Sequence, residues 1–493
     1  MNRDLRPHQS QAIEKLRRSL RSGKRRPVIQ APTGFGKTRV AAAIIEGALV
    51  KGKRVIFTVP ALSLVEQTVE AFWNDGVRNI GVIQGFHMMT DWSLPVQIAS
   101  VQTLQRRKIP EADVVIIDEC HRWFNSYGKW MMDPAWQGRP FIGLSATPWT
   151  RGLGQYYDDL IIAATTQDLI AAGYLSPFRV YAPSHPDLTG VRTVDGDYDE
   201  GDLSGVMNDS ALVADIVDTW LRRAENRSTF CFAVDRAHAK HLQQQFAAAG
   251  VSAGYIDAYT PGNEREDIHR KFQAGQIRVV CNVGCLTTGI DWDVRCIILA
   301  RPTKSEMLFV QIIGRGLRPA EGKEDCLILD HSDTHLRLGF VTDIHHDVLD
   351  DGRSRANSRS DRIRLPKECP QCAFLKPPRM RECPACGFKA EAISDVEIAD
   401  GELIEVIGRK KRDRQLSDGE KSAFYAQLKG YAQTHDYANG WAAHKFRDKF
   451  NLWPNGYEQV PAMDPTPKVL SWIKSRQIAW AKSKQHHVEQ PTA

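Results

Sequence analysis

The sequence predicts an α/β protein with two tandem parallel-sheet domains, then a four-cysteine module and a small helical C-terminal domain. Short apolar strands alternate with amphipathic helices over residues 27–145, and the same alternation returns after about residue 205. Such alternation, with continuously apolar strands, is typical of parallel sheets covered by helices on both faces. Four cysteines then fall close together at 369–386, and helical periodicity follows them.

The length and composition agree with a multidomain globular protein. The chain has 493 residues, which corresponds to roughly three domains of about 150 residues each. Hydrophobic residues make up 42% and charged residues 25%, as in ordinary globular chains. No apolar run approaches the ~20 residues of a membrane-spanning helix, and the charged N-terminus lacks the apolar core of a signal peptide. We therefore expect a cytoplasmic protein with no membrane partner.

The expected domain boundaries follow the strand–helix pattern. The first domain, 1–155, has strands at Pro27–Gln30, Arg54–Val59, Val96–Ala99, Asp113–Asp118 and Phe141–Leu144, with helices at Thr38–Val50 and Leu62–Asn74. Residues 156–205, which include the acidic stretch 195–202, lose the pattern and are interpreted as a linker. The second domain, 206–350, has strands at Thr229–Ala233, Val279–Asn282, Ile297–Ala300 and Cys326–Leu329, with helices at Arg236–Ala249, Asn263–Ala274 and Ser305–Ile313. A basic linker, 351–366, then leads to a metal module at 367–390 and a helical domain at 400–493.

A phosphate-binding loop is predicted at Ala31–Thr38, APTGFGKT, between the first strand and the first helix. At this position backbone N–H groups and a helix N-terminus can surround a polyphosphate. Gly34 and Gly36 let the backbone approach the phosphates, Lys37 can reach the β- and γ-oxygens, and the Thr38 hydroxyl can hold magnesium. The first glycine of the general pattern is replaced by Ala31.

Two consecutive acids, Asp118 and Glu119, follow the strand Val114–Ile117. The carboxyl ends of parallel strands form the crevice in which such sheets bind ligands. Asp118 can hold magnesium, and Glu119 can orient or deprotonate an attacking water. Together with the phosphate-binding loop, these acids predict hydrolysis of a nucleoside triphosphate.

The order of these and further motifs over about residues 5–330 resembles the superfamily 2 helicases and translocases. In the first half of the chain, LRPHQ (5–9) resembles the adenine-recognition motif, APTGFGKT resembles motif I, Pro60–Gln67 resembles motif Ia, and SVQTLQ (100–105) resembles the next nucleic-acid-contact motif. DECH (118–121) resembles motif II and SATP (145–148) resembles motif III. In the second half, CLTTGID (285–291) resembles motif V and Gln311–Arg318 resembles motif VI. The resemblance implies two RecA-like domains with ATP between them and nucleic acid lying across both.

The resemblance also implies residue roles. The ATP-binding set would be Arg6, Gln9, Thr33, Gly34, Gly36, Lys37, Thr38, Gly289 and Asp291. Arg315 and Arg318 would reach the γ-phosphate from the second domain, as arginine fingers do, and would complete a catalytic set with Lys37, Asp118 and Glu119. Coupling to domain movement would involve His121, Ser145, Thr147 and Gln311, with His121 and Gln311 in contact across the cleft. Pro60, Gln67, Thr103 and Thr287 would contact nucleic acid.

DNA is the expected nucleic acid. LRPHQ, DECH and SATP resemble the excision-repair and restriction-motor branch, whereas motif II of the DEAD-box RNA helicases ends in Asp. The prediction is an ATP-dependent DNA helicase or translocase. Two alternatives are an RNA helicase and a DNA-binding remodelling factor that uses ATP only as a conformational switch.

A zinc site is predicted at Cys369, Cys372, Cys383 and Cys386, because two CPxC sequences ten residues apart can close a tetrahedron of thiolates. So short a segment could not fold without such a metal. Disulfides are disfavoured in the cytosol, and an iron–sulfur cluster is an alternative that cysteines alone allow. The predicted role is structural, since no ligand position stays open for catalysis.

The C-terminal domain is expected to contain three helices and to be basic. Ser417–Glu420 forms a capping box, GWAAHKFRDKF (440–450) a second helix, and Pro467–Lys482 a third. Residues 401–493 contain 15 Lys and Arg against 10 Asp and Glu, which accounts for +5 of the net +6. This basic excess favours DNA or a protein as the partner of the domain. The GWAAHKF stretch resembles the tails of phage and prophage helicases, which implies a bacterial or phage-infected host cell.

Overall fold

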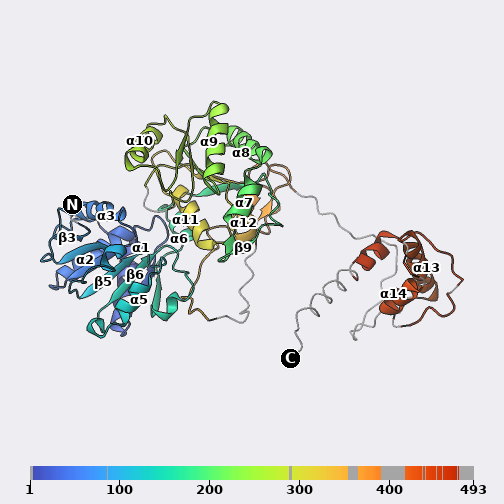
Figure 1. The fold of residues 1–493 in the computed structure, drawn as a ribbon, viewed down its shortest axis with the longest axis horizontal. Helices are drawn as coiled ribbons and strands as arrows, with labels where there is room; N and C mark the ends of the chain where they lie inside the picture. The colour runs from blue at the N-terminus through green and yellow to red at the C-terminus, as the bar shows by residue number, and fades with distance from the viewer. Residues whose placement is uncertain are drawn as a thin grey trace. The chain divides into compact units, whose positions relative to one another are not determined.

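A computed structural model describes residues 4–85, 87–287, 291–353, 365–389 and 417–476, except 436, 439, 451, 458 and 475 within the last range. The chain divides into two compact units, Met1–Ile393 and Ser394–Ala493 (Figure 1). The first unit contains two large parallel sheets and the four cysteines, and the described part of the second is helical. No described helix has the length and apolarity that crossing a bilayer requires.

The first sheet has seven parallel strands in the order β3-β4-β2-β5-β6-β1-β7. Its strands are β1 (Pro27–Gln30), β2 (Val55–Val59), β3 (Ile80–Ile83), β4 (Val96–Ser100), β5 (Val114–Asp118), β6 (Phe141–Ser145) and β7 (Asp159–Ile162). Its helices are α1 (Pro7–Arg21), α2 (Lys37–Leu49), α3 (Leu64–Asn74), α4 (Val101–Leu104), α5 (Asn125–Met132) and α6 (Thr166–Ala171). The strands from β1 to β4 and β6 are buried along their whole length, which explains their continuous apolar sequences.

The second sheet has six parallel strands in the order β12-β13-β11-β14-β15-β8. They are β8 (Phe178–Tyr181), β11 (Thr229–Phe232), β12 (Ala253–Ile256), β13 (Val279–Asn282), β14 (Cys296–Leu299) and β15 (Cys326–Asp330). The accompanying helices are α7 (Glu200–Met207), α8 (Ser210–Arg223), α9 (Arg236–Ala248), α10 (Gly262–Gln273), α11 (Glu306–Gly316) and α12 (Thr334–Leu338). The prediction of two tandem parallel-sheet domains is therefore confirmed.

The segment 156–205, predicted as a linker, is instead built into both sheets. Its strand β7 pairs with β1, and its strand β8 pairs with β15. Residues 195–202 contain the end of a hairpin, β9 (Thr193–Val194) with β10 (Asp197–Tyr198), and the start of α7. Asp197 accepts hydrogen bonds from Thr303 Oγ1 at 2.6 Å and from the Lys304 N–H at 2.7 Å. The prediction of a linker rests on the loss of the strand–helix pattern and on the acidic stretch, whereas Asp197 binds the second domain.

A strap, residues 340–353, returns from the second domain to the first after α12. His346 Nε2 lies 2.7 Å from the carboxylate of Glu306 at the start of α11, and its ring lies 4.6 Å from the ring of Trp149 in the first domain. Further along, Asp350 O accepts from Gly154 N at 2.7 Å, and Leu349 packs on apolar residues of the first domain. The strap therefore joins the two domains at a second place, besides the connection through 156–205.

The four-cysteine module lies against the second domain. Its hairpin pairs β16 (Lys367–Glu368) with β17 (Leu375–Lys376). Ala182 N donates to Ala373 O at 2.9 Å, and the rings of Tyr181 and Phe374 lie 5.3 Å apart. Since β8 is the last strand of its sheet, the module covers the edge of that sheet.

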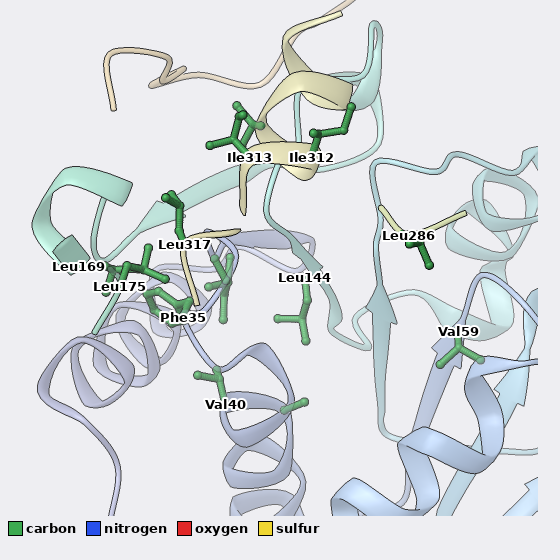
Figure 2. Packing of buried hydrophobic residues seen from close by; sticks show 14 of the residues in the cluster. Phe35, Val40, Val59, Leu144, Leu169, Leu175, Leu286, Ile312, Ile313 and Leu317 are labelled. Carbon is green, nitrogen blue, oxygen red and sulfur yellow. The ribbon is translucent and has the colours of Figure 1, made fainter. Parts of the chain in front are cut away.

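The largest cluster of buried apolar side chains takes its members from both sheet-containing domains. Figure 2 shows Phe35, Leu169, Leu175 and Leu317 in this cluster. Ser176 N donates to Leu317 O at 2.8 Å, which ties the segment before β8 to the end of α11. This packing holds α11 close to the phosphate-binding loop.

The described part of the second unit contains α13 (Asp418–Thr434), α14 (Trp441–Phe450) and a further helical run over 467–474. The predicted capping box is confirmed: Ser417 Oγ accepts from Glu420 N, and the Glu420 side chain accepts from Ser417 N. Five buried residues form the core, namely Leu428, Ala442, Phe446, Val469 and Ile473. Positions 477–482 of the predicted third helix, and 354–364 of the predicted basic linker, lie outside the described residues.

Candidate active site between the two sheets

The phosphate-binding loop has the backbone that its glycines predict. Gly34 and Gly36 have φ angles of 84° and 85°, in the left-handed region that favours glycine. A Cβ at Gly36 would collide with the side chain of Gln9, and a Cβ at Gly34 with that of Leu175. Lys37 is the first residue of α2, so the loop runs directly into the N-terminus of that helix.

Gln9 and Arg6 lie beside this loop, at the start of α1. Gln9 Nε2 donates to Phe35 O at 2.9 Å, and Gln9 Oε1 accepts from Arg6 N at 3.0 Å. The Arg6 guanidinium lies 4.9 Å from the centre of the Tyr174 ring. The adenine-recognition motif suggested by the sequence is therefore in direct contact with motif I.

Lys37 forms ion pairs with both acids of motif II in this structure. Its ammonium lies 3.9 Å from Asp118 and forms a short hydrogen bond with Glu119. Burial raises the pKa of Asp118 to about 6, with a further contribution from the charge of Glu119. Burial alone would also raise the pKa of Glu119, but Lys37 and His121 hold it well below its usual range. Glu119 is therefore ionised beside the lysine.

Glu119 has a φ of 46°, although it is not glycine. Such left-handed backbone is uncommon for residues with a side chain and is concentrated at functional sites. It lies directly after the end of β5, where the chain turns toward the phosphate-binding loop.

A hydrogen-bond network joins motifs II, III and VI across the two domains. His121 Nδ1 lies 2.8 Å from Ser145 Oγ, and Ser145 Oγ accepts from Thr147 N at 3.0 Å. Gln311 Nε2 lies 3.1 Å from His121 Nε2 and donates to Thr147 Oγ1 at 3.2 Å. The predicted contact between His121 and Gln311 is thereby confirmed.

Arg315 and Arg318 approach the same site from α11 and the turn that follows it. Arg315 is only 8% exposed, and burial together with the charge of Arg318 lowers its pKa to about 10. Arg318 Nη1 donates to Asp291 Oδ1 at 2.5 Å. A Cβ at Gly314 would lie 2.5 Å from Thr33 Oγ1, so α11 packs directly on the phosphate-binding loop.

These groups surround one cavity of about 600 Å³, a volume within the usual range of ligand sites. Eight of the nine predicted ATP-binding residues line it: Arg6, Gln9, Thr33, Gly34, Gly36, Lys37, Thr38 and Asp291. The ninth, Gly289, lies outside the described residues. Asp118, Glu119, Gln311, Arg315 and Arg318 line the same cavity. Both domains therefore contribute charged groups to one site.

The four residues predicted to contact nucleic acid lie on separate segments of the two sheet-containing domains. Pro60 and Gln67 line the cavity described above. Thr103 lies in the first turn of α4, where its N–H is capped by Ser100 Oγ at 3.2 Å. Thr287 is buried and donates to Gly284 O at 2.8 Å. Their role stays a prediction.

Tyr174 is a cavity residue that the sequence analysis missed. It follows α6 and lies between Arg6 and His8, whose ring centre is 4.7 Å from its own. A half-buried aromatic face at a nucleotide cavity can stack on a base. No local pattern marked Tyr174, because its segment was interpreted as a linker.

The four cysteines suit a single tetrahedral metal ion. Their sulfur atoms all lie within 4.8 Å of one another, and the Cys369–Cys386 and Cys372–Cys383 pairs are each 3.7 Å apart. Metal–sulfur bonds of about 2.3 Å in a tetrahedron place sulfurs about 3.8 Å apart. Cys383 N donates to Phe388 O at 2.8 Å, and Gly387, with φ of 72°, turns the second knuckle. The donor set fits zinc.

Comparisons with known proteins agree with this site. The family model described as "Type III restriction enzyme, res subunit" matches residues 2–150, and "Helicase conserved C-terminal domain" matches residues 211–320. The "51.5 kDa protein" of a Lactococcus phage (isolate 7-9) is 28% identical over 372 residues, which cover 73% of this chain and 77% of the phage protein. The "Putative ATP-dependent helicase IRC3" of Saccharomyces cerevisiae is 30% identical over 355 residues, 66% of this chain and 51% of the yeast protein.

Among solved structures, the "ATP-dependent Type ISP restriction-modification enzyme LlaBIII bound to DNA" is similar with a TM-score of 0.50 and 20% identity. The match covers 66% of this chain and 27% of that one, and it supports the fold alone. The chain thus spans about half of the yeast relative and a smaller part of the restriction enzyme. Because both helicase domains are matched in order and their motifs meet at one cavity, the chain belongs to the superfamily 2 helicases.

Proposed function

We propose that this helicase couples ATP hydrolysis to movement along DNA or to its unwinding. The observation that carries the proposal is the single cavity lined by Lys37 and Glu119 from the first domain and by Arg315 from the second. Since the site is complete only when the domains are together, binding of ATP can favour closure and its hydrolysis can favour opening.

Lys37 would exchange its carboxylate partners for the β- and γ-phosphates. That exchange would free Glu119 to orient and deprotonate the attacking water. Arg315 and Arg318 would stabilise charge on the γ-phosphate in the transition state. Thr38 and Asp118 would hold magnesium, which neutralises charge on the phosphate oxygens when bound.

The network of His121, Ser145, Thr147 and Gln311 would transmit this chemistry to the domains. His121 is separated from Glu119 by 3.3 Å, and Gln311 contacts His121 from the other domain at 3.1 Å. A change in the position of Glu119 therefore reaches α11 through two contacts. We propose zinc at the four cysteines with a structural role, and action in the cytoplasm of a bacterial or phage-infected cell.

DNA is proposed over RNA on two grounds. Motif II ends in His121 rather than Asp, and the matched restriction-enzyme structure was determined with DNA. Both are arguments by analogy.

The test is ATP turnover with single-stranded DNA, duplex DNA, RNA or no nucleic acid, followed by strand displacement on the best activator. We expect stimulation by DNA above that by RNA and none in the Lys37→Ala control. Stronger stimulation by RNA would replace DNA with RNA in the proposal. Nucleic-acid-stimulated turnover without displacement or translocation would favour an ATP-switched remodelling factor.

A further inference from the structure

The second unit gathers three cations at one corner of its helical core. Lys449 lies on α14, and Lys468 and Arg476 lie on the helical run that begins at 467. All three side chains are exposed. Burial and the neighbouring charges of Arg476 and Lys468 lower the pKa of Lys449, which indicates that the three charges are close. The cations therefore repel one another.

Aromatic rings fix this corner. Lys449 Nζ lies 5.3 Å from the centre of the Trp472 ring and 5.8 Å from that of Phe424. Arg476 lies 5.8 Å from the same Trp472 ring. Phe424 and Trp472 pack edge to face at 5.3 Å, directly beside the buried core. The lysine stem is therefore held on a rigid base while its charge faces solvent.

Acidic groups on the surrounding elements have other partners. Asp418 accepts from Lys421 at 3.4 Å, and Asp448 accepts from Lys445 at 2.8 Å. Glu420 closes the capping box with Ser417. Among the described residues, no carboxylate lies within 4.0 Å of the Lys449, Lys468 or Arg476 cationic groups, whereas Lys421 and Lys445 each have one. The corner thus differs from Lys421 and Lys445 in that no described carboxylate is its counter-ion.

We propose that Lys449, Lys468 and Arg476, on the base of Phe424 and Trp472, bind the phosphate backbone of the nucleic acid on which the motor acts. Three close, uncompensated cations are stabilised by a polyanion, which relieves their mutual repulsion. Counter-ions released from the phosphates add a favourable, salt-dependent contribution. The surface gives the motor a second contact with its track, outside the two sheet-containing domains. This inference rests on the proposed function, because it takes the same nucleic acid as its ligand.

The test uses the full chain and a pair of matched double variants. Lys449→Gln with Arg476→Gln removes two charges from the corner, and Lys421→Gln with Lys445→Gln removes two lysines that are already paired. Binding of a fluorescein-labelled 30-nucleotide single strand and of a 30-base-pair duplex is measured by anisotropy over a range of NaCl concentrations. Thermal unfolding and ATP turnover without nucleic acid provide the controls for intact folding and an intact motor.

The slope of log K against log [salt] is negative. We expect the corner variant to reduce its magnitude by about 0.7 per removed cation on the single strand and by about 0.9 per removed cation on the duplex. The matched variant should change the slope much less. Among the described residues, Lys468 forms no cation–π contact with either ring. Lys468→Gln should therefore reduce the magnitude of the slope by the amount for one cation, and this variant is used if the double variant unfolds.

If the wild-type chain binds nucleic acid and the corner and matched variants have equal slopes, the proposed surface is rejected. The proposed function of the motor is not affected by that outcome. A wild-type chain that binds no nucleic acid at low salt would instead reject the proposed function. If the duplex slope alone falls, the surface binds duplex DNA, and if the single-strand slope alone falls, it binds single strands.

Discussion

Lys37 and Glu119 neutralise each other in this structure, and this has a consequence for turnover. A base that is hydrogen-bonded to a lysine and held at low pKa cannot accept a proton from water. We propose that withdrawal of Lys37 toward phosphate would remove that restraint, so that Glu119 would act as a base only when the nucleotide is bound. Proton transfer from water to Glu119 would thereby be avoided while no nucleotide is bound.

We predict that Glu119→Gln binds ATP but hydrolyses it about 10²–10⁴-fold more slowly, since only the base is lost. Turnover and equilibrium binding of a non-hydrolysable analogue measure the two effects separately. Lys37→Ala is the comparison, because it should lose affinity as well as turnover. If Glu119→Gln loses affinity as severely as Lys37→Ala, Glu119 is a binding residue rather than the base.

We predict that Arg315→Ala and Arg318→Ala each reduce turnover by about 10²–10³-fold while ATP affinity falls much less, because charge on the phosphate develops in the transition state. Arg315→Lys should recover little, since lysine lacks the planar fork of donors. The same two assays apply, with thermal unfolding as the control because Arg315 is buried. Equal losses in affinity and turnover would assign these arginines to ground-state binding.

Most residues of the site could be predicted from the sequence because their motifs follow strand ends that meet at one edge of each sheet. Gln311 and His121 were correctly paired although 190 residues separate them. Tyr174 could not be predicted, since its place depends on how the chain runs from β7 to β8. Arg318 is predicted to lie at the phosphate. No pattern in the sequence predicts its hydrogen bond with Asp291 in this structure.

At the scale of elements, the strap is fitted closely to the first domain. A Cβ at Gly154 would lie 3.0 Å from Asp350 O and 3.2 Å from Leu349 Cβ. Between strap and domain, the rings of Trp149 and His346 lie 4.6 Å apart in a tilted arrangement. The strap therefore limits how far the domains can separate.

We predict that Gly154→Val destabilises the protein by about 1–3 kcal/mol through overpacking and raises the KM for ATP, because the two halves of the cavity are held together less well. Thermal unfolding and steady-state kinetics provide the measurements. Gly190→Val is the control, since no atom lies within 4 Å of a Cβ at that position. An unchanged KM in a destabilised Gly154→Val protein would show that the strap stabilises without coupling the domains.

The four-cysteine module is the other element with a testable role. We predict one zinc per chain and no visible absorption band, measured by elemental analysis and spectroscopy. Cys369→Ser should lose the metal and unfold the module, since structural zinc contributes about 10–16 kcal/mol to such small folds. Cys285→Ser, at a half-buried cysteine outside the cluster, is the control. Iron in place of zinc would replace the assignment with an iron–sulfur cluster.

The inner strands of both sheets were predicted, and the four strands at the sheet edges, β3, β7, β8 and β12, were not. β8 has the sequence FRVY and β7 the sequence DLII, and only part of each strand is buried. Their partners, β15 and β1, are fully buried and were predicted. The sequence of a four-residue edge strand contains too little periodicity to distinguish it from a loop.

At the scale of the whole molecule, we predict that a chain ending at Arg353 still hydrolyses ATP, because the strap and both sheets are kept. It should, however, be less soluble than a chain ending at Ile393, because removal of the module exposes β8 as an open sheet edge. Turnover and light scattering of the two truncated chains provide the comparison. Equal light scattering of the two chains would show that the edge of β8 does not promote aggregation when the four-cysteine module is absent.

The returning strap also has a consequence for the newly made chain. Leu349 packs on the first domain, whose last helix, α6, ends at Ala171, so the surface under the strap stays uncovered until roughly 180 further residues have been synthesised. At about 5–20 residues per second, that delay is on the order of 10–40 s. Trp123 and Tyr156, whose rings stack at 4.2 Å, line this surface together with Gly352 of the strap. The apolar surface of the first domain under the strap is therefore covered only after both sheet-containing domains have been made.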